Sequence, residues 1–378
     1  MTPGVTILST ADIDSAVWTN KQYLAVGLAG KTKVSYIESM GLRAPTLSTS
    51  DMRRILGKIQ TQRSGSKVSR PIPSDLQVVS PKVLPFHGSG MCRRINLRLV
   101  RDHLLRRIDE SCRDVLWTFS PLTYGLEKEF DRVVYHSVDL LHTLPGVPAN
   151  LILESEERLC SISDYVLASS SGVAQHLQQY RGDVRLWQNV ADVERFTRSG
   201  AAPREPQAVF AGNLTPTKID FSLLQQVADL GFTLKLAGPV NIDGIAGHSF
   251  LDELLQRPNV EHLGNLSLDE LSDLFNRSMV GLIPYRANEY TQGVFPLKVY
   301  EYMAAGMSVV STPIASLVAS APPGVIITTF GDFSRDVERS IQSWSEGNAV
   351  KQSELAQGHS WTNRIEEAWD LLSENPGG

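Results

Sequence analysis

The sequence predicts an α/β protein built from two doubly wound parallel sheets. Its 378 residues exceed one ordinary domain and fit two domains of about 150 to 200 residues each. Short apolar runs alternate with helical patterns in both halves, as in strands joined by crossover helices. A stretch rich in small residues and proline, 198–206, separates the halves. We therefore expect a first domain at 1–200, a second at 201–360, and a C-terminal helix in 361–378.

The expected strands are short runs rich in β-branched and other apolar residues. In the first half they are 5–9, 33–37, 77–80, 115–119, 132–136, 165–168 and 184–187. In the second half they are 208–211, 233–237, 260–263, 280–284, 308–311 and 325–328. Ligands of doubly wound sheets bind outside the carboxyl ends of the strands, so we expect the site residues in the loops that follow the strands.

The segment 294–306 has the features of a helix start directed at an anion. Pro296 suits the first helical turn, because the N–H that proline lacks is not needed there, and the backbone N–H groups from Leu297 onward can bind phosphate oxygens. Lys298 adds a cation, and Glu301 follows three residues later on the same side of the helix. The alternative is an ordinary amphipathic helix with a surface lysine and glutamate.

The Pro-x-Lys-x-x-Glu-Tyr pattern that begins at Pro296 resembles the donor-site helix of GT-B glycosyltransferases, particularly the family 4-like enzymes of bacterial surface polysaccharide and teichuronic acid synthesis. The resemblance implies a GT-B fold, with two Rossmann-like domains facing a cleft and a C-terminal helix, in 361–378, that crosses back to the first domain. It also implies that Lys298 contacts the nucleotide diphosphate and that Glu301 binds the ribose. Many family 4 members have two glutamates eight positions apart, and here the first would fall on Gly293. Glu289, four residues earlier, is the candidate replacement near the sugar.

A second loop of the same half has a phosphate-binding pattern. A strand leads into a glycine, and Pro216 follows near an expected helix start with a basic residue in its first turn. In GT-B enzymes the corresponding loop approaches the donor diphosphate, so the resemblance nominates Gly212, Asn213, Thr215 and Lys218. A turn with a capping threonine and an exposed lysine would look the same.

The turn at 263–266 precedes a helix for which Ser267 and Glu270 have capping-box spacing. The cap itself is structural. In enzymes that this sequence resembles, the nucleotide base is held at this turn, which nominates Gly264 as a donor contact.

The strand 132–136 ends in an ionisable pair, His136 and Asp139. In family 4-like enzymes this strand end places a histidine or aspartate beside the donor sugar. His136 could bind a sugar hydroxyl, and Asp139 could accept the proton of the acceptor if the enzyme inverts configuration. The alternative is that Asp139 caps the following turn and that His136 is a satisfied residue at a strand end.

Asp12 and Asp14 superficially match the Asp-x-Asp metal motif of the other glycosyltransferase fold. They lie in the wrong domain for that role, and an aspartate after a strand is more often a turn former. We therefore expect neither a metal nor a cofactor, since the nucleotide sugar is a substrate. Asp12, Trp18 and Asn20 remain candidate acceptor contacts.

The first half of the chain is basic and the second acidic. Residues 1–200 carry 25 Lys and Arg against 20 Asp and Glu, and residues 201–378 carry 11 against 21. Most of the excess lies in 91–108, whose leucines and isoleucine have helical spacing. The cations of this segment are Arg93, Arg94, Arg98, Arg101, Arg106 and Arg107, and the predicted apolar stripe is Leu97, Leu104, Leu105 and Ile108.

This segment is either a surface helix packed on the core or a patch that docks on anionic lipid head groups. Nucleic acid is not an expected partner, because the net charge is −5 and basic and aromatic residues are not interleaved. No run of about 18 apolar residues is present, and the N-terminus does not resemble a signal peptide. We therefore expect a cytoplasmic protein, either free or peripheral at the inner face of the membrane, whose three cysteines are free thiols.

Together with these observations, the resemblance implies a metal-independent glycosyltransferase that moves a sugar from a UDP- or GDP-sugar to a saccharide or lipid-linked acceptor in surface glycan synthesis. Lys298, the helix N-terminal amides and Lys218 would stabilise the leaving diphosphate. Retention and inversion of configuration both remain open. Two alternatives are a GT-B relative that hydrolyses or epimerises a nucleotide sugar, and a non-catalytic partner subunit of a glycan assembly complex.

Overall fold

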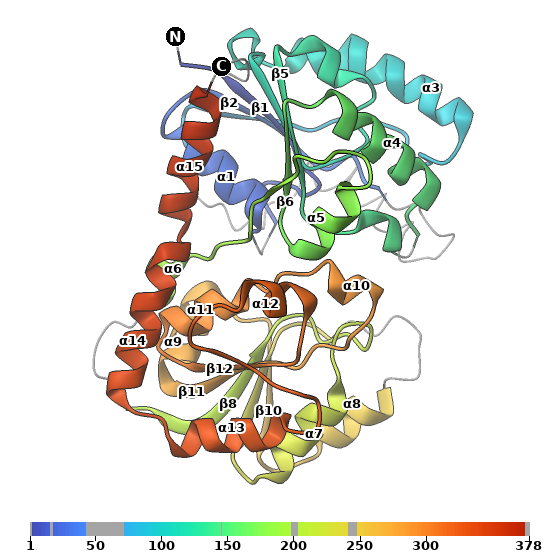
Figure 1. Cartoon of the computed structure of the whole chain (residues 1–378). Helices are drawn as coiled ribbons and strands as arrows, with labels where there is room; N and C mark the ends of the chain where they lie inside the picture. Colours follow the sequence, from blue (N-terminus) through green and yellow to red (C-terminus); the bar gives the residue numbers. More distant parts are fainter. Residues whose placement is uncertain are drawn as a thin grey trace, which may run out of the picture. The chain divides into compact units, whose positions relative to one another are not determined.

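The computed structural model describes residues 2–15, 18–42, 72–144, 146–197, 203–240 and 248–374. The chain divides into two compact units, which are described separately (Figure 1). Unit 1 comprises Met1–Trp187 and Ile365–Gly378, and unit 2 comprises Gln188–Arg364. Each unit is built on a sheet whose strands are all parallel, which confirms the predicted fold class.

The sheet of unit 1 has the order β3-β2-β1-β4-β5-β6-β7. Its strands are β1 Val5–Leu8, β2 Val34–Ile37, β3 Leu76–Val79, β4 Val115–Thr118, β5 Arg132–Ser137, β6 Tyr165–Ala168 and β7 Arg185–Leu186, at the predicted positions to within one or two residues. β1 pairs with β2 on one side and with β4 on the other. The strand order therefore reverses between β1 and β4, and this is the point where doubly wound sheets bind ligands.

Helices cover this sheet and include the last helix of the chain (Figure 1). They are α1 Asn20–Ala29, α3 Gly90–Leu99, α4 Ala149–Ile162, α5 Ser171–Leu177 and α15 Trp361–Ser373. From Ile365 onward, α15 belongs to unit 1. Ile365 fills the space beside Gly27 of α1, where an added Cβ would lie 2.4 Å from its Cδ1 atom.

The basic segment 91–108 is helical, but its buried face differs from the predicted stripe. α3 continues as a π-helical turn, Val100–Leu104, and a 3₁₀ turn, Leu105–Arg107. Its fully buried positions are Asn96, Val100, Leu104 and Ile108. Leu97, a member of the predicted apolar stripe, does not belong to the buried face, because it is 46% exposed. The amide of Asn96 instead pairs with the backbone of Leu84, at 2.7 and 3.0 Å, and so sets which face turns inward.

The sheet of unit 2 has the order β10-β9-β8-β11-β12-β13. Its strands are β8 Glu205–Ala211, β9 Thr233–Ala237, β10 Val260–Gly264, β11 Ser278–Ile283, β12 Ser308–Ser311 and β13 Val325–Ile327, again where strands were predicted. The expected linker 198–206 needs one correction, because its last two residues already form the start of β8. Residues 198–202 lie outside the described part of the chain.

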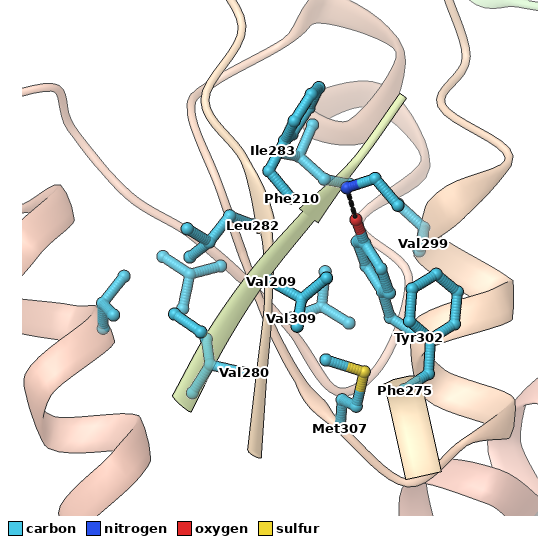
Figure 2. Close-up of a cluster of buried hydrophobic side chains, with 14 of the residues drawn as sticks. Val209, Phe210, Phe275, Val280, Leu282, Ile283, Val299, Tyr302, Met307 and Val309 are labelled. Atoms are coloured by element: carbon cyan, nitrogen blue, oxygen red, sulfur yellow. Dashed lines mark hydrogen bonds between the residues drawn. The ribbon is translucent and has the colours of Figure 1, made fainter. Parts of the chain in front are cut away.

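The core of unit 2 lies between this sheet and its helices, and Figure 2 shows part of it. The helices are α6 Val193–Phe196, α7 Phe221–Asp229, α8 His248–Leu255, α9 Leu268–Arg277, α10 Glu289–Gln292, α11 Lys298–Ala304, α12 Ala315–Ser320, α13 Phe333–Gln342 and α14 Glu346–Ala356. Tyr302 of α11 is fully buried, and its hydroxyl accepts a hydrogen bond from the backbone N–H of Ala211 at 2.8 Å (Figure 2). This bond joins α11 to the end of β8.

Two further sequence predictions concern thiols and the membrane. Cys92, Cys112 and Cys160 are all free thiols, as predicted. Burial raises the pKa of the Cys160 thiol to about 12, so this group stays protonated at neutral pH. Within the described ranges, no helix has both the length and the apolar character needed to cross a bilayer.

Candidate functional site

The predicted anion-binding helix is α11, and it begins at Lys298, two residues after Pro296. The ammonium of Lys298 forms an ion pair with the carboxylate of Glu301, one turn further along the helix. Both side chains are largely buried, with 24% and 11% of their surface exposed. The same ammonium lies 5.9 Å from the ring centres of Phe196 and Phe275. A charge pair that is partly withdrawn from water interacts more strongly with nearby charges than an exposed pair does.

Arg204 holds the far end of α11, and sequence reasoning missed it. Its guanidinium donates to the carbonyl oxygens of Ala305, Ser278 and, at 3.1 Å, Phe275. These carbonyls lie at the ends of α11 and α9, where a cation offsets the negative end of the helix dipole. The sequence placed Arg204 in the linker, and no local pattern indicates that it reaches residues about 70 to 100 positions later.

The loop after β8 does not lead into a helix at Pro216, which corrects the prediction. Residues 215–219 form a turn in which the Lys218 and Ile219 amides donate to the Thr215 carbonyl, at 3.1 and 2.9 Å. α7 begins only at Phe221, where the Asp220 side chain caps it. The Lys218 ammonium lies 4.4 Å from the centre of the Tyr285 ring, beyond the end of β11. Lys218 therefore lies at the carboxyl edge of the sheet, as expected, but on a turn.

Three loops at this edge stack on one another through their backbones. The Gly212 N–H donates to Ala237 O at 2.8 Å, and the Gly238 N–H donates to Gly264 O at 2.7 Å. Gly238 has φ +134°, and an added Cβ would lie 2.0 Å from the carbonyl oxygen of Gly212, so only glycine fits there. Gly212 and Gly264 were predicted donor contacts, whereas Gly238 was missed. The space beside Gly238 is therefore filled by the neighbouring backbone, whereas a Cβ added at Gly264 would meet nothing within 4 Å.

The other predicted donor residues lie beside this edge. Asn213 is exposed in the loop after β8, and Leu297 and Pro296 immediately precede α11. Glu289 is exposed in α10, and the neighbouring Asn288 donates to Thr217 O at 2.8 Å, which joins α10 to the Lys218 turn. Gly293, at the position of the usual first glutamate, is buried. The capping box at Ser267 is present as predicted, since Ser267 accepts from the Glu270 amide and Glu270 accepts from the Ser267 amide.

His136 and Asp139 both lie at the carboxyl end of β5 in unit 1. His136 is within the strand, and Asp139 follows it. His136 is buried, and its Nδ1 atom accepts a hydrogen bond from the indole of Trp117 at 3.4 Å. Its ring lies 4.8 Å from that of Phe119. Asp139 is half-buried two residues beyond the strand. The structure therefore places both residues at the predicted edge, while their proposed roles remain predictions.

The predicted acceptor residues lie in the loop after β1 and at the start of α1. The backbone carbonyl of Asp12 accepts from the Gln22 side chain at 3.0 Å, and the indole of Trp18 donates to Ile13 O at 3.2 Å. Asn20 is buried in the first turn of α1, which Thr19 and Gln22 close with a capping box. The next residue, Lys21, is also buried, and sequence reasoning did not select it.

One cluster in the described residues has the composition of a metal site. His142, Glu156 and His176 place one ligand atom each within 4.8 Å of one another. Glu156 is fully buried, its Oε1 atom accepts from the Tyr135 hydroxyl at 2.7 Å, and its Oε2 atom lies 2.9 Å from His176 Nε2. The carboxylate therefore already has hydrogen-bond partners on both oxygens, and all three residues of the cluster belong to unit 1.

Comparison with known proteins gives a family match in unit 2. Residues 205–343 match the family described as glycosyl transferases group 1. A protein of Bacillus subtilis (strain 168), TuaH, whose name places it as a glycosyltransferase in teichuronic acid biosynthesis, is 29% identical over 229 residues. This match covers 55% of the present chain and 57% of the relative, so it spans less than two thirds of that protein.

Solved structures resemble the chain over nearly its whole length. Sucrose-phosphate synthase from Thermosynechococcus elongatus has a TM-score of 0.71 at 13% identity, with 98% of each chain covered. Anabaena HepE in complex with UDP-glucose has a TM-score of 0.63 at 13% identity, covering 98% of this chain and 99% of the other. At this level of identity the comparison shows the fold alone, which is the predicted GT-B fold.

Proposed function

We propose that this chain, in which residues 205–343 form a glycosyltransferase group 1 domain within a GT-B fold, transfers a sugar from a nucleoside diphosphate sugar to a saccharide or lipid-linked saccharide. The observation that carries this proposal is the Lys298–Glu301 pair on α11, which lies inside the matched residues. Solved structures of the same fold hold UDP or UDP-glucose, which supports a uridine nucleotide as the first donor to test. Surface polysaccharide synthesis is the proposed setting, from the name of the Bacillus relative.

The proposed chemistry is electrostatic. As the bond between the sugar and the phosphate breaks, negative charge grows on the leaving diphosphate. Lys298 would stabilise that charge, with Lys218 at the same edge of the sheet, and Glu301 would accept hydrogen bonds from the ribose hydroxyls. A ribose in this place takes over part of the interaction that Glu301 now makes with Lys298, which frees the ammonium to face the diphosphate. These groups would act without a metal or a further cofactor.

Titration of the whole chain with nucleotides tests the proposal. We expect UDP or GDP, and the corresponding nucleotide sugars, to bind with dissociation constants in the micromolar to millimolar range that is usual for substrates. Isothermal calorimetry with UDP, GDP, UDP-glucose and GDP-mannose measures this directly. Absence of binding by all four would contradict the proposal and favour a non-catalytic partner subunit. Binding followed by release of free sugar, even with acceptors present, would favour a nucleotide-sugar hydrolase.

The basic segment supports a peripheral contact with an anionic membrane at the cytoplasmic face as a second part of the proposal. Arg94 and Arg98 are exposed and lie one turn apart on α3. Met91 and Ile95, also exposed and one turn apart, place apolar side chains next to them. Cations beside exposed apolar groups fit an interface where lipid head groups meet acyl chains, and such a surface would bring the enzyme to a lipid-linked acceptor.

Charge reversal tests this contact. We expect the triple variant Arg93→Glu, Arg94→Glu and Arg98→Glu to lose most of its binding to vesicles that contain phosphatidylglycerol, because each basic residue near such a surface contributes about 1 kcal/mol. Co-sedimentation with vesicles measures the bound fraction. Reversal of Arg335 and Arg339, exposed cations on α13 of unit 2, is the matched control. Equal sedimentation of the triple variant and the wild type would exclude the membrane contact.

A further inference from the structure

Three side chains from separate elements of unit 1 face one another. Glu156 lies on α4, His176 on α5, and His142 in the 3₁₀ turn Leu141–Thr143 that follows β5. α4 packs against both α5 and this turn, so the packing of the elements brings the three residues together. Each residue offers one ligand atom, and these atoms lie within 4.8 Å of one another.

Both imidazoles are directed at the same carboxylate oxygen of Glu156. Its Oε2 atom lies 2.9 Å from His176 Nε2 and 4.0 Å from His142 Nδ1. The two imidazole rings stack, with centres 4.6 Å apart and planes inclined by 28°. A hydrogen bond to His176 explains the first distance to Oε2, but the second is too long for a hydrogen bond. A buried ion pair requires only one histidine, so the position of the second one calls for a further explanation.

The distances fit a divalent metal ion with nitrogen and oxygen ligands. Zn²⁺ binds histidine nitrogen at about 2.0 to 2.1 Å and carboxylate oxygen at about 2.0 to 2.2 Å, so the ligand atoms of a tetrahedral site lie about 3.3 to 3.5 Å apart. The two nitrogens, at 2.9 and 4.0 Å from Oε2, lie on either side of this range. Shifts of about 0.5 Å would give both of them the spacing from this oxygen that zinc requires.

Tyr135 of β5 holds the carboxylate in a suitable orientation. Its hydroxyl donates a hydrogen bond to Glu156 Oε1 at 2.7 Å, which leaves Oε2 on the side of the histidines. Hydrogen-bond partners of this kind orient the ligands of metal sites. Tyr135 and Glu156 are fully buried, whereas the side chains of His142 and His176 are 17% and 13% exposed. The cluster therefore has a buried carboxylate and a histidine side that solvent reaches.

We propose that His142, Glu156 and His176 bind a zinc ion, with water as the fourth ligand. Two histidines and one carboxylate suit Zn²⁺ and disfavour Mg²⁺ and Ca²⁺, which prefer oxygen ligands. On binding, the proton between His176 and Glu156 moves to the other nitrogen of the imidazole, or to water if that ring is charged, and Nε2 becomes a ligand. The sequence gave no such expectation, because the three ligands are 14 and 20 positions apart and form no short motif.

The ion would have a structural role in unit 1, separate from the proposed donor chemistry. It would join the turn after β5 to α4 and α5 through one ligand from each. The same turn follows Asp139, whose carbonyl accepts a hydrogen bond from the Leu141 N–H at 2.9 Å. Coordination of His142, the next residue, would therefore restrain the backbone beside Asp139.

Zinc titration of the whole chain, after removal of bound metal with a chelator, tests the site. By calorimetry we expect one Zn²⁺ to bind per chain, and an equal concentration of Mg²⁺ or Ca²⁺ not to displace it. His142→Ala changes the most exposed ligand and should bind zinc at least about 100-fold more weakly. Tyr135→Phe, which keeps all three ligands, should bind it about 10- to 100-fold more weakly. His103→Ala, at an exposed position of the same unit, is the matched control and should bind as the wild type does.

Two further readouts locate the ion. The melting temperature should rise with zinc concentration in the wild type and in His103→Ala, but not in His142→Ala, because a ligand that binds only the folded chain stabilises it. Co²⁺ in place of zinc should show the visible absorption of a tetrahedral site without a thiolate charge-transfer band. Such a band would place the ion on a cysteine and overturn the proposal. So would failure of the wild type to bind zinc, equal zinc affinity of His142→Ala and the wild type, or displacement of zinc by Mg²⁺.

Discussion

The Lys298→Met variant is expected to lose transfer activity by about 10²- to 10³-fold in kcat/KM, the usual effect of removing a group that stabilises charge in the transition state. Methionine keeps the apolar stem of the side chain beside Phe196 and Phe275, so the packing of α11 should be retained and the loss should come from the missing ammonium. Steady-state kinetics with the donor identified by calorimetry measure the effect. A drop in kcat, rather than only a rise in KM, is the expected signature of charge stabilisation in the transition state.

The Glu301→Ala variant separates binding from chemistry. Glu301 is assigned to the ribose, so its loss should weaken UDP binding at least about tenfold, as expected for hydrogen bonds made by a charged group. Lys351→Ala, at an exposed position on α14 of the same unit, is the matched control and should leave kinetics and UDP affinity unchanged. If Lys298→Met and Glu301→Ala both behave as the wild type, the donor site lies elsewhere.

The central strands were predictable because they are short apolar runs that the sheet buries on both faces. β1, with the sequence Val-Thr-Ile-Leu, is buried at every position, and β12 is nearly so. The beginning of β8 was missed because Glu205 and Pro206 are exposed and resemble a linker. The inward face of α3 was misjudged because a polar residue, Asn96, occupies a core position through hydrogen bonds to Leu84. The spacing of apolar residues along a helix cannot identify a polar residue that occupies a core position.

The candidate site was predictable only where its chemistry is local in sequence. Lys298 and Glu301 are one helical turn apart, so their pairing follows from spacing alone. Arg204 and Gly238 act on segments that are distant in sequence, through the carbonyl of Ala305 and the backbone of Gly212. Lys21 begins a helix, where a lysine is normally exposed, and only the fold shows that this one is buried. Contacts that depend on the tertiary fold leave no periodic signal in the chain.

The Gly281→Ala substitution is expected to cause the largest loss of stability. Gly281 lies in β11 beneath the ring of Tyr302, and an added Cβ would lie 2.3 Å from a carbon of that ring. The tyrosine is fully buried and cannot move outward without breaking the bond between its hydroxyl and the Ala211 N–H (Figure 2). Overpacking of about 1 to 3 kcal/mol and an unpaired buried N–H of about 1 to 3 kcal/mol predict a total of about 2 to 6 kcal/mol.

Urea unfolding followed by circular dichroism measures this loss, and a double-mutant cycle tests its cause. Tyr302→Phe alone should cost about 1 to 3 kcal/mol, because it leaves the Ala211 N–H without its acceptor. In the Gly281→Ala background the same change should cost almost nothing, since the hydroxyl has already moved away. Gly347→Ala in α14, where an added Cβ meets nothing within 4 Å, is the control and should not lower stability. Additive losses in the cycle would mean that alanine at position 281 is accommodated without moving Tyr302.

If Gly281→Ala displaces Tyr302 as expected, UDP affinity should also fall. Tyr302 is adjacent to Glu301, and its displacement shifts the helix that carries the donor-binding pair.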